Sequence, residues 1–101
     1  MNTIDTTALF NQIPTIDINI NSYNRNGFES ELYIDTFTIF YKILGGIDTY
    51  SRLKGDEYET RLSDRTWVEV DAIMDDEGEE MEGYDKETLE QLIKESISWE
   101  Y

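Results

Sequence analysis

The feature that most constrains the fold is the strict alternation of apolar and polar residues in two separate segments. Residues 16–20 read Ile-Asp-Ile-Asn-Ile, and residues 67–73 alternate in the same way. Side chains two apart on a β-strand point to the same face, so both segments are predicted to be strands with one buried face. For the second strand the predicted faces are Val68, Val70 and Ala72 on one side and Trp67, Glu69, Asp71 and Ile73 on the other.

Turn signals predict further strands. Residues 24–27 (Asn-Arg-Asn-Gly) are typical of a tight turn, because Asn and Gly tolerate positive φ. The first strand and residues 28–34 are therefore predicted to form a hairpin. Residues 54–57 (Lys-Gly-Asp-Glu) are predicted to be a second hairpin loop, between strands at 50–53 and 58–62.

Residues 35–44 fit two structures. Their Thr, Phe, Ile and Tyr content favours a strand. Alternatively, Asp35 would cap a helix with apolar residues at helical spacing, and Gly45-Gly46 would end it. We favour the strand.

A helix is predicted near each end of the chain. Asp5 is a suitable N-cap for a short helix that runs to about Gln12 and stops before Pro14. Asp85 is the expected N-cap of the second helix. Its apolar stripe is Leu89, Leu92, Ile93 and Ile97. The sequence therefore predicts one acidic α+β domain over residues 1–101: an antiparallel β-meander of four to five strands, a short N-terminal helix, and a C-terminal amphipathic helix packed on one face.

Composition excludes several kinds of chemistry. The chain has 101 residues with no Cys and no His, which removes disulfides, Cys/His zinc sites and imidazole catalysis. The first ten residues lack the basic and apolar regions of a secretory signal, and no apolar run approaches the ~18–20 residues needed to span a bilayer. We therefore expect a cytoplasmic protein, in the host cytoplasm if a phage encodes it.

Charge is the other dominant property. The formal net charge is −15, and residues 56–101 carry 17 acids against four bases. That magnitude exceeds the roughly 2–8 charges that solubility alone requires, and it costs stability through self-repulsion. Phosphate backbones and anionic membranes would be repelled, so neither is an expected partner. A basic protein would be attracted.

The candidate partner-binding residues come from the acid-rich stretches. Residues 69–82 hold eight acids and no base, and residues 74–83 are predicted to be an acidic loop. Carboxylates two apart on a strand lie about 6.7 Å apart, a spacing suited to a cleft that normally holds phosphates. The candidates are Glu57, Glu59, Glu69, Asp71, Asp75, Asp76, Glu77, Glu79, Glu80 and Glu82, with Tyr58 and Trp67 as candidate aromatic anchors. The competing interpretation is a solvated loop, with Trp67 in the core.

Catalytic and metal-dependent functions find little support. No EF-hand spacing is present, because placing Gly78 at the sixth loop position puts Ile73 at the first. Gly45-Gly46 lacks the Gly-Lys-Ser/Thr of a phosphate-binding loop. A carboxylate pair for glycoside hydrolysis would need a desolvated cleft. We therefore expect no enzyme activity, no catalytic residue, no cofactor and no metal site.

In size, charge, lack of cysteine and α+β pattern, the chain resembles small acidic inhibitors of phages and mobile elements, the anti-CRISPR and anti-restriction proteins that mimic DNA. The resemblance is one of overall character and matches no motif. It implies an inhibitor that occupies the basic nucleic-acid-binding groove of a defence nuclease complex. Alternatives are an immunity protein or antitoxin that covers a cognate toxin, and a cation-binding or solvated accessory domain.

Overall fold

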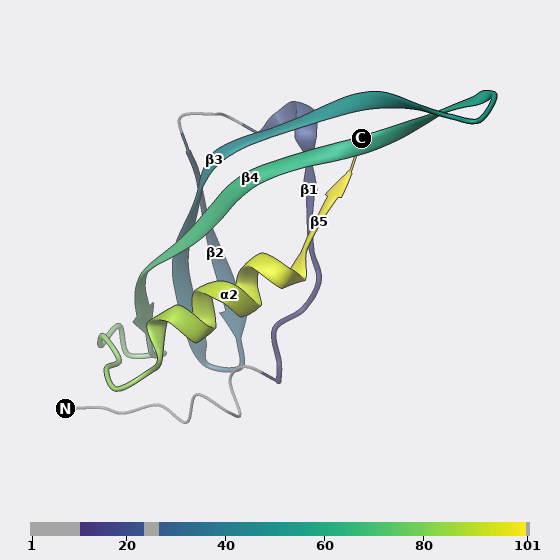
Figure 1. The fold of residues 1–101 in the computed structure, drawn as a ribbon. Coiled ribbons are helices and arrows are strands. Elements are labelled where there is room, and N and C mark those ends of the chain that lie inside the picture. The colour runs from purple at the N-terminus through teal and green to yellow at the C-terminus, as the bar shows by residue number, and fades with distance from the viewer. Residues whose placement is uncertain (1–10, 24–26, 101) are drawn as a thin grey trace.

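The computed structural model describes residues 11–23 and 27–100, which form two small sheets and one α-helix (Figure 1). In chain order the elements are β1 (Ile16–Asn19), the 3-10 turn η1 (Ile20–Ser22), β2 (Phe28–Ile34), β3 (Phe37–Lys54), β4 (Glu57–Met74), α2 (Lys86–Ser96) and β5 (Ile97–Glu100). Strands β2, β3 and β4 form an antiparallel sheet in that order, and β1 pairs with β5 in parallel.

The predicted meander of four to five strands is wrong. The antiparallel sheet has three strands, and β1 pairs with β5 at the other end of the chain, with Ile16 opposite Ile97 and Ile18 opposite Trp99. The reason is that the extended backbone of β1 ends at η1, before the turn that was predicted at residues 24–27. Helix α2 then brings the chain back beside β1 in the parallel direction. Most of the predicted N-terminal helix lies outside the described residues, and its last two residues, Asn11 and Gln12, are in a turn.

Residues 35–44 are largely strand, as favoured, but β3 does not stop there. It continues for 18 residues, and β4 matches it with another 18, so the short strands predicted between residues 50 and 73 are parts of one long hairpin. The loop predicted at residues 54–57 is confirmed, since Lys54 pairs with Glu57. Gly55 has φ 63°, as the first central residue of a type II′ turn requires.

A β-bulge decides which residues of β4 face the core. Tyr41 pairs with Val70 and Phe40 pairs with Ala72, which leaves Asp71 as the extra residue. The alternation therefore shifts by one position after Val70. Ile73 is fully buried while Ala72 is not, contrary to the sequence prediction that grouped Ala72 with Val70.

The core lies between the three-stranded sheet and α2. Its fully buried side chains are Ile39, Ile43, Val70, Ile73, Leu89 and Ile93. The helix begins as predicted, because the carboxylate of Asp85 accepts a hydrogen bond from the backbone N–H of Thr88 at 3.2 Å. It also covers the outer edge of β4, where the Glu90 carboxylate accepts from the Val70 N–H at 2.8 Å. Ile97, predicted to belong to the helical stripe, begins β5 instead.

The hairpin of β3 and β4 runs beyond the core as a projecting arm (Figure 1). We call residues 48–63 the arm and the remainder of the chain the body. The molecule measures 59 Å along its long axis against 26 and 19 Å across it. Twelve of the sixteen arm residues are exposed, including Leu53 at 59% and Tyr58 at 78%, and Asp48, Glu59, Leu62 and Ser63 are half-buried.

Candidate acidic interaction surface

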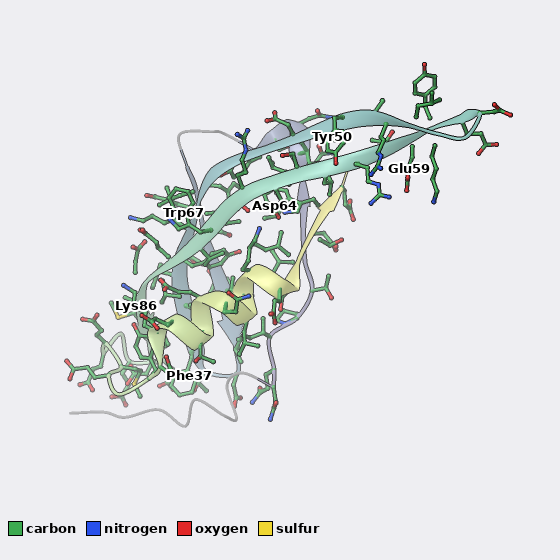
Figure 2. All side chains as sticks on the ribbon, in the orientation of Figure 1. Phe37, Tyr50, Glu59, Asp64, Trp67 and Lys86 are labelled. Atoms are coloured by element: carbon green, nitrogen blue, oxygen red, sulfur yellow. The ribbon has the colours of Figure 1, made fainter. Side chains whose placement is uncertain are left out.

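The structure distributes the sequence-predicted residues over three places (Figure 2). Glu57, Tyr58 and Glu59 lie near the outer end of the arm. Trp67, Glu69 and Asp71 lie on the part of β4 that belongs to the body. The remaining acids form the loop after Met74, at the opposite end of β4 from the arm tip. The arm acids are therefore separate from the other two groups.

Within the body, the sheet face that points away from α2 carries four carboxylates, and we call this part of the sheet the acidic face. They are Glu29, Glu31, Glu69 and Asp71. In the register, Lys42 stands between Glu29 on β2 and Glu69 on β4. Its Nζ lies 3.4 Å from Glu69 Oε2 and 3.7 Å from Asp71 Oδ1. The negative charges of Asp71 and then Glu69 raise the pKa of Lys42.

Sequence reasoning missed Glu29 and Glu31, although the signal was present. They alternate with Phe28, Ser30 and Leu32 along β2, so they share the face opposite the core. A hollow on this face is lined by Glu29, Ser30, Glu31, Phe40, Tyr41 and Asp71. At its margin the hydroxyl of Tyr33 donates a hydrogen bond to Glu31, which raises the pKa of Tyr33.

The acidic loop is held by its own hydrogen bonds. Asp75 Oδ1 accepts from the backbone N–H groups of Glu77 at 2.9 Å and Glu79 at 2.8 Å. The Asp75 N–H donates to the Glu79 carbonyl at 2.9 Å, and the Met81 N–H donates to the Ile73 carbonyl at 2.7 Å. Met81 is buried, with 6% of its surface exposed. The loop therefore has a fixed backbone, and one Asp75 carboxylate oxygen serves the loop itself.

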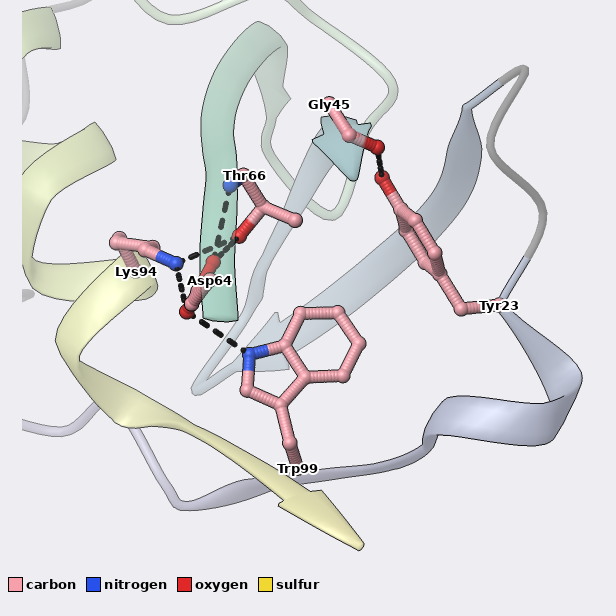
Figure 3. A network of polar contacts seen from close by, with 6 residues as sticks. All are labelled: Tyr23, Gly45, Asp64, Thr66, Lys94 and Trp99. Carbon is pink, nitrogen blue, oxygen red and sulfur yellow. Dashed lines mark hydrogen bonds and ion pairs between the residues drawn. The ribbon is translucent and has the colours of Figure 1, made fainter. Parts of the chain in front are cut away.

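A polar network at the base of the arm was not foreseen from the sequence (Figure 3). Asp64 Oδ1 accepts from the N–H of Thr66 at 2.9 Å, and Asp64 Oδ2 accepts from Trp99 Nε1 at 3.2 Å. Lys94 of α2 forms an ion pair with Asp64 and donates to Thr66 Oγ1 at 2.6 Å. Partial burial alone would raise the pKa of Asp64, but hydrogen bonds from Lys94 and Thr66 outweigh it and hold that pKa below its ordinary value.

Two aromatic residues extend this network to the other side of the arm. The Tyr23 hydroxyl donates to the Gly45 carbonyl at 2.6 Å, and the Tyr23 and Trp99 rings meet edge to face with centroids 5.3 Å apart. Burial, and then the charge of Asp64, raise the pKa of Tyr23. The network thus connects both strands of the arm base to α2 and β5. Its chemistry is that of a structural support.

Charge is polarised along the molecule. The arm contains four acids and three bases, so its net charge is −1 and the body carries −14 of the total −15. Across the arm, Arg52 stands opposite Glu59 and Lys54 opposite Glu57. The acidic face and the acidic loop therefore form the strongly negative end.

The density of acids does not create a metal site in the described part of the chain. Within residues 11–23 and 27–100, no three acidic side chains are grouped so that they could hold a metal ion. The single α-helix in this described part is too short and polar to span a bilayer. In comparisons with known proteins, no family model, curated protein or solved structure matches the chain.

Proposed function

We propose that this protein is a non-catalytic inhibitor that binds the basic nucleic-acid-binding groove of a partner protein by mimicking DNA. The partner class we favour is a defence nuclease complex in the cytoplasm. The observation that carries the proposal is the polarised charge, with 14 of the 15 excess negative charges on the body. Such a field attracts a cationic cleft and orients the approach to it.

The arrangement of the carboxylates supports this function. Those of the acidic face are fixed on paired strands, where neighbours along a strand are about 6.7 Å apart and neighbouring strands about 4.8 Å apart. Duplex DNA also presents closely spaced negative charges, about one per 1.7 Å of axis. Because the acidic loop has a hydrogen-bonded backbone, its charges add to this array at a small entropic cost of ordering.

Trp67 supplies a candidate contact of a different kind. It is 52% exposed and neighbours Leu44 on the face that carries Glu69 and Asp71. A large aromatic side chain within a polar rim is a frequent source of binding energy. We assign Trp67 to the proposed interface. Tyr58, the other aromatic candidate, is on the arm and away from this face.

Capture from a host lysate tests the proposal when it is combined with competition. The immobilised protein should retain a nucleic-acid-binding protein, and duplex DNA should displace it. Retention should fall steeply as salt is raised, because screening weakens contacts between exposed charges. A partner that is indifferent to both salt and DNA would contradict DNA mimicry and would favour the immunity-protein alternative.

Matched variants sharpen this experiment. Glu69→Gln with Asp71→Asn removes two charges from the acidic face, and Asp76→Asn with Glu77→Gln removes two from the loop without touching Asp75. Each pair should weaken retention by about tenfold if two contacts of about 0.7 kcal/mol are lost. Glu57→Gln with Glu59→Gln removes the same charge from the arm and should retain the partner.

A further inference from the structure

The arm has exposed side chains, and the outer edges of its two strands are not paired with another strand of the described residues. In the arm, β3 and β4 pair only with each other. Among the described residues, no strand pairs with the outer edge of β3 after the end of its pairing with β2, and none pairs with the outer edge of β4 from Glu57 to Ser63. An isolated two-stranded hairpin is marginally stable in water, and a free strand edge is a template for pairing with another chain. The β4 edge of the arm contains no proline, glycine or bulge that would block such pairing.

One face of the arm is free of charge, although 31% of the chain is charged. Counting outward from the buried residues Ile43 and Ile47, alternate positions of both strands share the core-side face. On the arm these are Thr49, Ser51, Leu53, Tyr58, Thr60 and Leu62. Two of them, Leu53 and Tyr58, are among the most exposed large hydrophobic residues.

We propose that the arm is a homodimerisation element, in which β4 of two copies pairs antiparallel about a two-fold axis at Thr60. This pairing is self-complementary on both faces. On one face Tyr58 stands opposite Leu62 of the second copy. On the other face Glu59 stands opposite Arg61 of the second copy, and symmetry repeats each pair.

The backbone pattern permits this register. A two-residue turn makes Lys54 and Glu57 a hydrogen-bonded pair, and such pairs alternate with non-hydrogen-bonded ones along an antiparallel ladder. Ser51 and Thr60 are then a non-hydrogen-bonded pair, so Thr60 directs its N–H and carbonyl to the free edge. A second Thr60 can therefore exchange two hydrogen bonds with it.

The charge distribution favours a second copy of this chain as the partner that pairs with the free β4 edge. Two bodies of charge −14 repel each other, whereas the arms carry only −1 each. Antiparallel arms place the two bodies at opposite ends of a four-stranded sheet. The acidic loops are then tens of ångströms apart, several times the Debye length of about 8 Å. The β3 edge is less suitable, because it presents Arg52 and Lys54, and its Asp48 is 3.2 Å from Arg65.

Analytical ultracentrifugation over a wide concentration range tests the dimer. The parent mass should rise from 11.9 kDa toward twice that value as concentration increases. The overlap of seven residues, Glu57 to Ser63, is short for a standard interface, so we expect association at micromolar concentrations or above. A monomer throughout the range, up to about millimolar protein, would overturn the proposal.

Two charge variants then test the register. Arg61→Glu places a second glutamate opposite Glu59 of the other copy, so the pair becomes repulsive. Arg52→Glu with Glu59→Arg keeps the cross-strand pair within the arm but places two arginines opposite each other in the dimer. Each variant alone should dimerise about tenfold more weakly than the parent. An equimolar mixture should form a heterodimer, because every opposed pair is then attractive.

Lys54→Glu is the matched control. It changes the charge by the same amount as Arg61→Glu but lies on β3, so dimerisation should be unchanged. Weakening by Lys54→Glu without weakening by Arg61→Glu would overturn the β4 register, as would a mixture that stays monomeric. The melting temperature and circular dichroism of each variant establish that the fold is retained. The outcome is independent of the proposed function, because it is measured without any partner protein.

Discussion

Asp64 on β4 and Lys94 on α2 are 30 residues apart in sequence and form an ion pair at the point where the arm leaves the body. Both side chains are more than two-thirds buried. The same carboxylate accepts from Thr66 and Trp99. This contact connects the helix, the long hairpin and β5, so it supports the base of the arm from three elements.

Asp64→Asn should lower the stability of the protein by about 1–2 kcal/mol, because Lys94 keeps its charge and loses its anionic partner. Chemical denaturation of the purified variant measures the change. Lys94→Met combined with Asp64→Asn should cost less than the sum of the two single changes, because the pair is broken only once. Simple additivity in this double-mutant cycle would contradict an energetic coupling between the two residues.

The low pKa of Asp64 makes the effect of Asp64→Asn depend on pH. The unfolded carboxyl titrates near 3.8, and the folded one below it, so the unfolded state binds the proton first as pH falls. The stabilisation from Asp64 is therefore complete above the unfolded pKa and is lost as pH falls through the folded pKa. The stability difference between parent and variant should be constant from pH 7 to about pH 5 and shrink below about pH 4. A difference that grows on acidification would contradict this sign.

Gly45 should tolerate no side chain. Its φ is 94°, and a Cβ there would lie 2.2 Å from the Arg65 carbonyl oxygen and 2.9 Å from the Trp67 ring. Gly45→Ala should therefore destabilise the protein by about 2 kcal/mol or more. Gly46→Ala is the matched control, because the added Cβ meets only the Arg65 side chain at 3.9 Å. Thermal melts compare the two, and equal losses would mean that the close approach at Gly45 is unimportant.

Local patterns in the sequence were sufficient for several elements. Alternation identified the strands around Ile18 and Val70, Asp85 marked the start of α2, and the Gly55 turn was placed correctly. These features depend on neighbouring residues, where backbone and side-chain preferences act directly.

The pairing of the strands depended on contacts that local patterns do not encode. The partner of β1 lies about 80 residues away in β5, and the turn signal after β1 predicted β2 instead. Phe40 pairs with Ala72 and Tyr41 pairs with Val70, so Asp71 is an extra residue in β4. This bulge places Ala72 and Ile73 on the faces opposite to those that the alternation predicted. The Gly45-Gly46 pair also fitted a helix end, but the strand passes through it, and Arg65 and Trp67 approach Gly45 closely.

The candidate surface was predicted in composition better than in arrangement. Residues 69–82 do carry a dense group of acids at one end of the molecule. Glu57 and Glu59 are at the other end, since one continuous 18-residue strand separates the arm tip from the loop. The sequence analysis predicted separate short strands in this region, so it did not indicate how far Glu57 and Glu59 lie from the loop.

The backbone of the acidic loop is held by the carboxylate of Asp75. Asp75→Ala removes the acceptor of the Glu77 and Glu79 N–H groups, so both amides should exchange with solvent about tenfold faster. Asp76→Ala removes the same charge from the adjacent residue and should leave both exchange rates unchanged. Hydrogen exchange followed by NMR measures the two variants side by side. If the proposed inhibitor function needs fixed loop charges, Asp75→Ala should also weaken partner binding more than Asp76→Ala does. Equal exchange rates in the two variants would show instead that the Asp75 carboxylate does not hold the loop, and its binding role would then be that of any other acid in the segment.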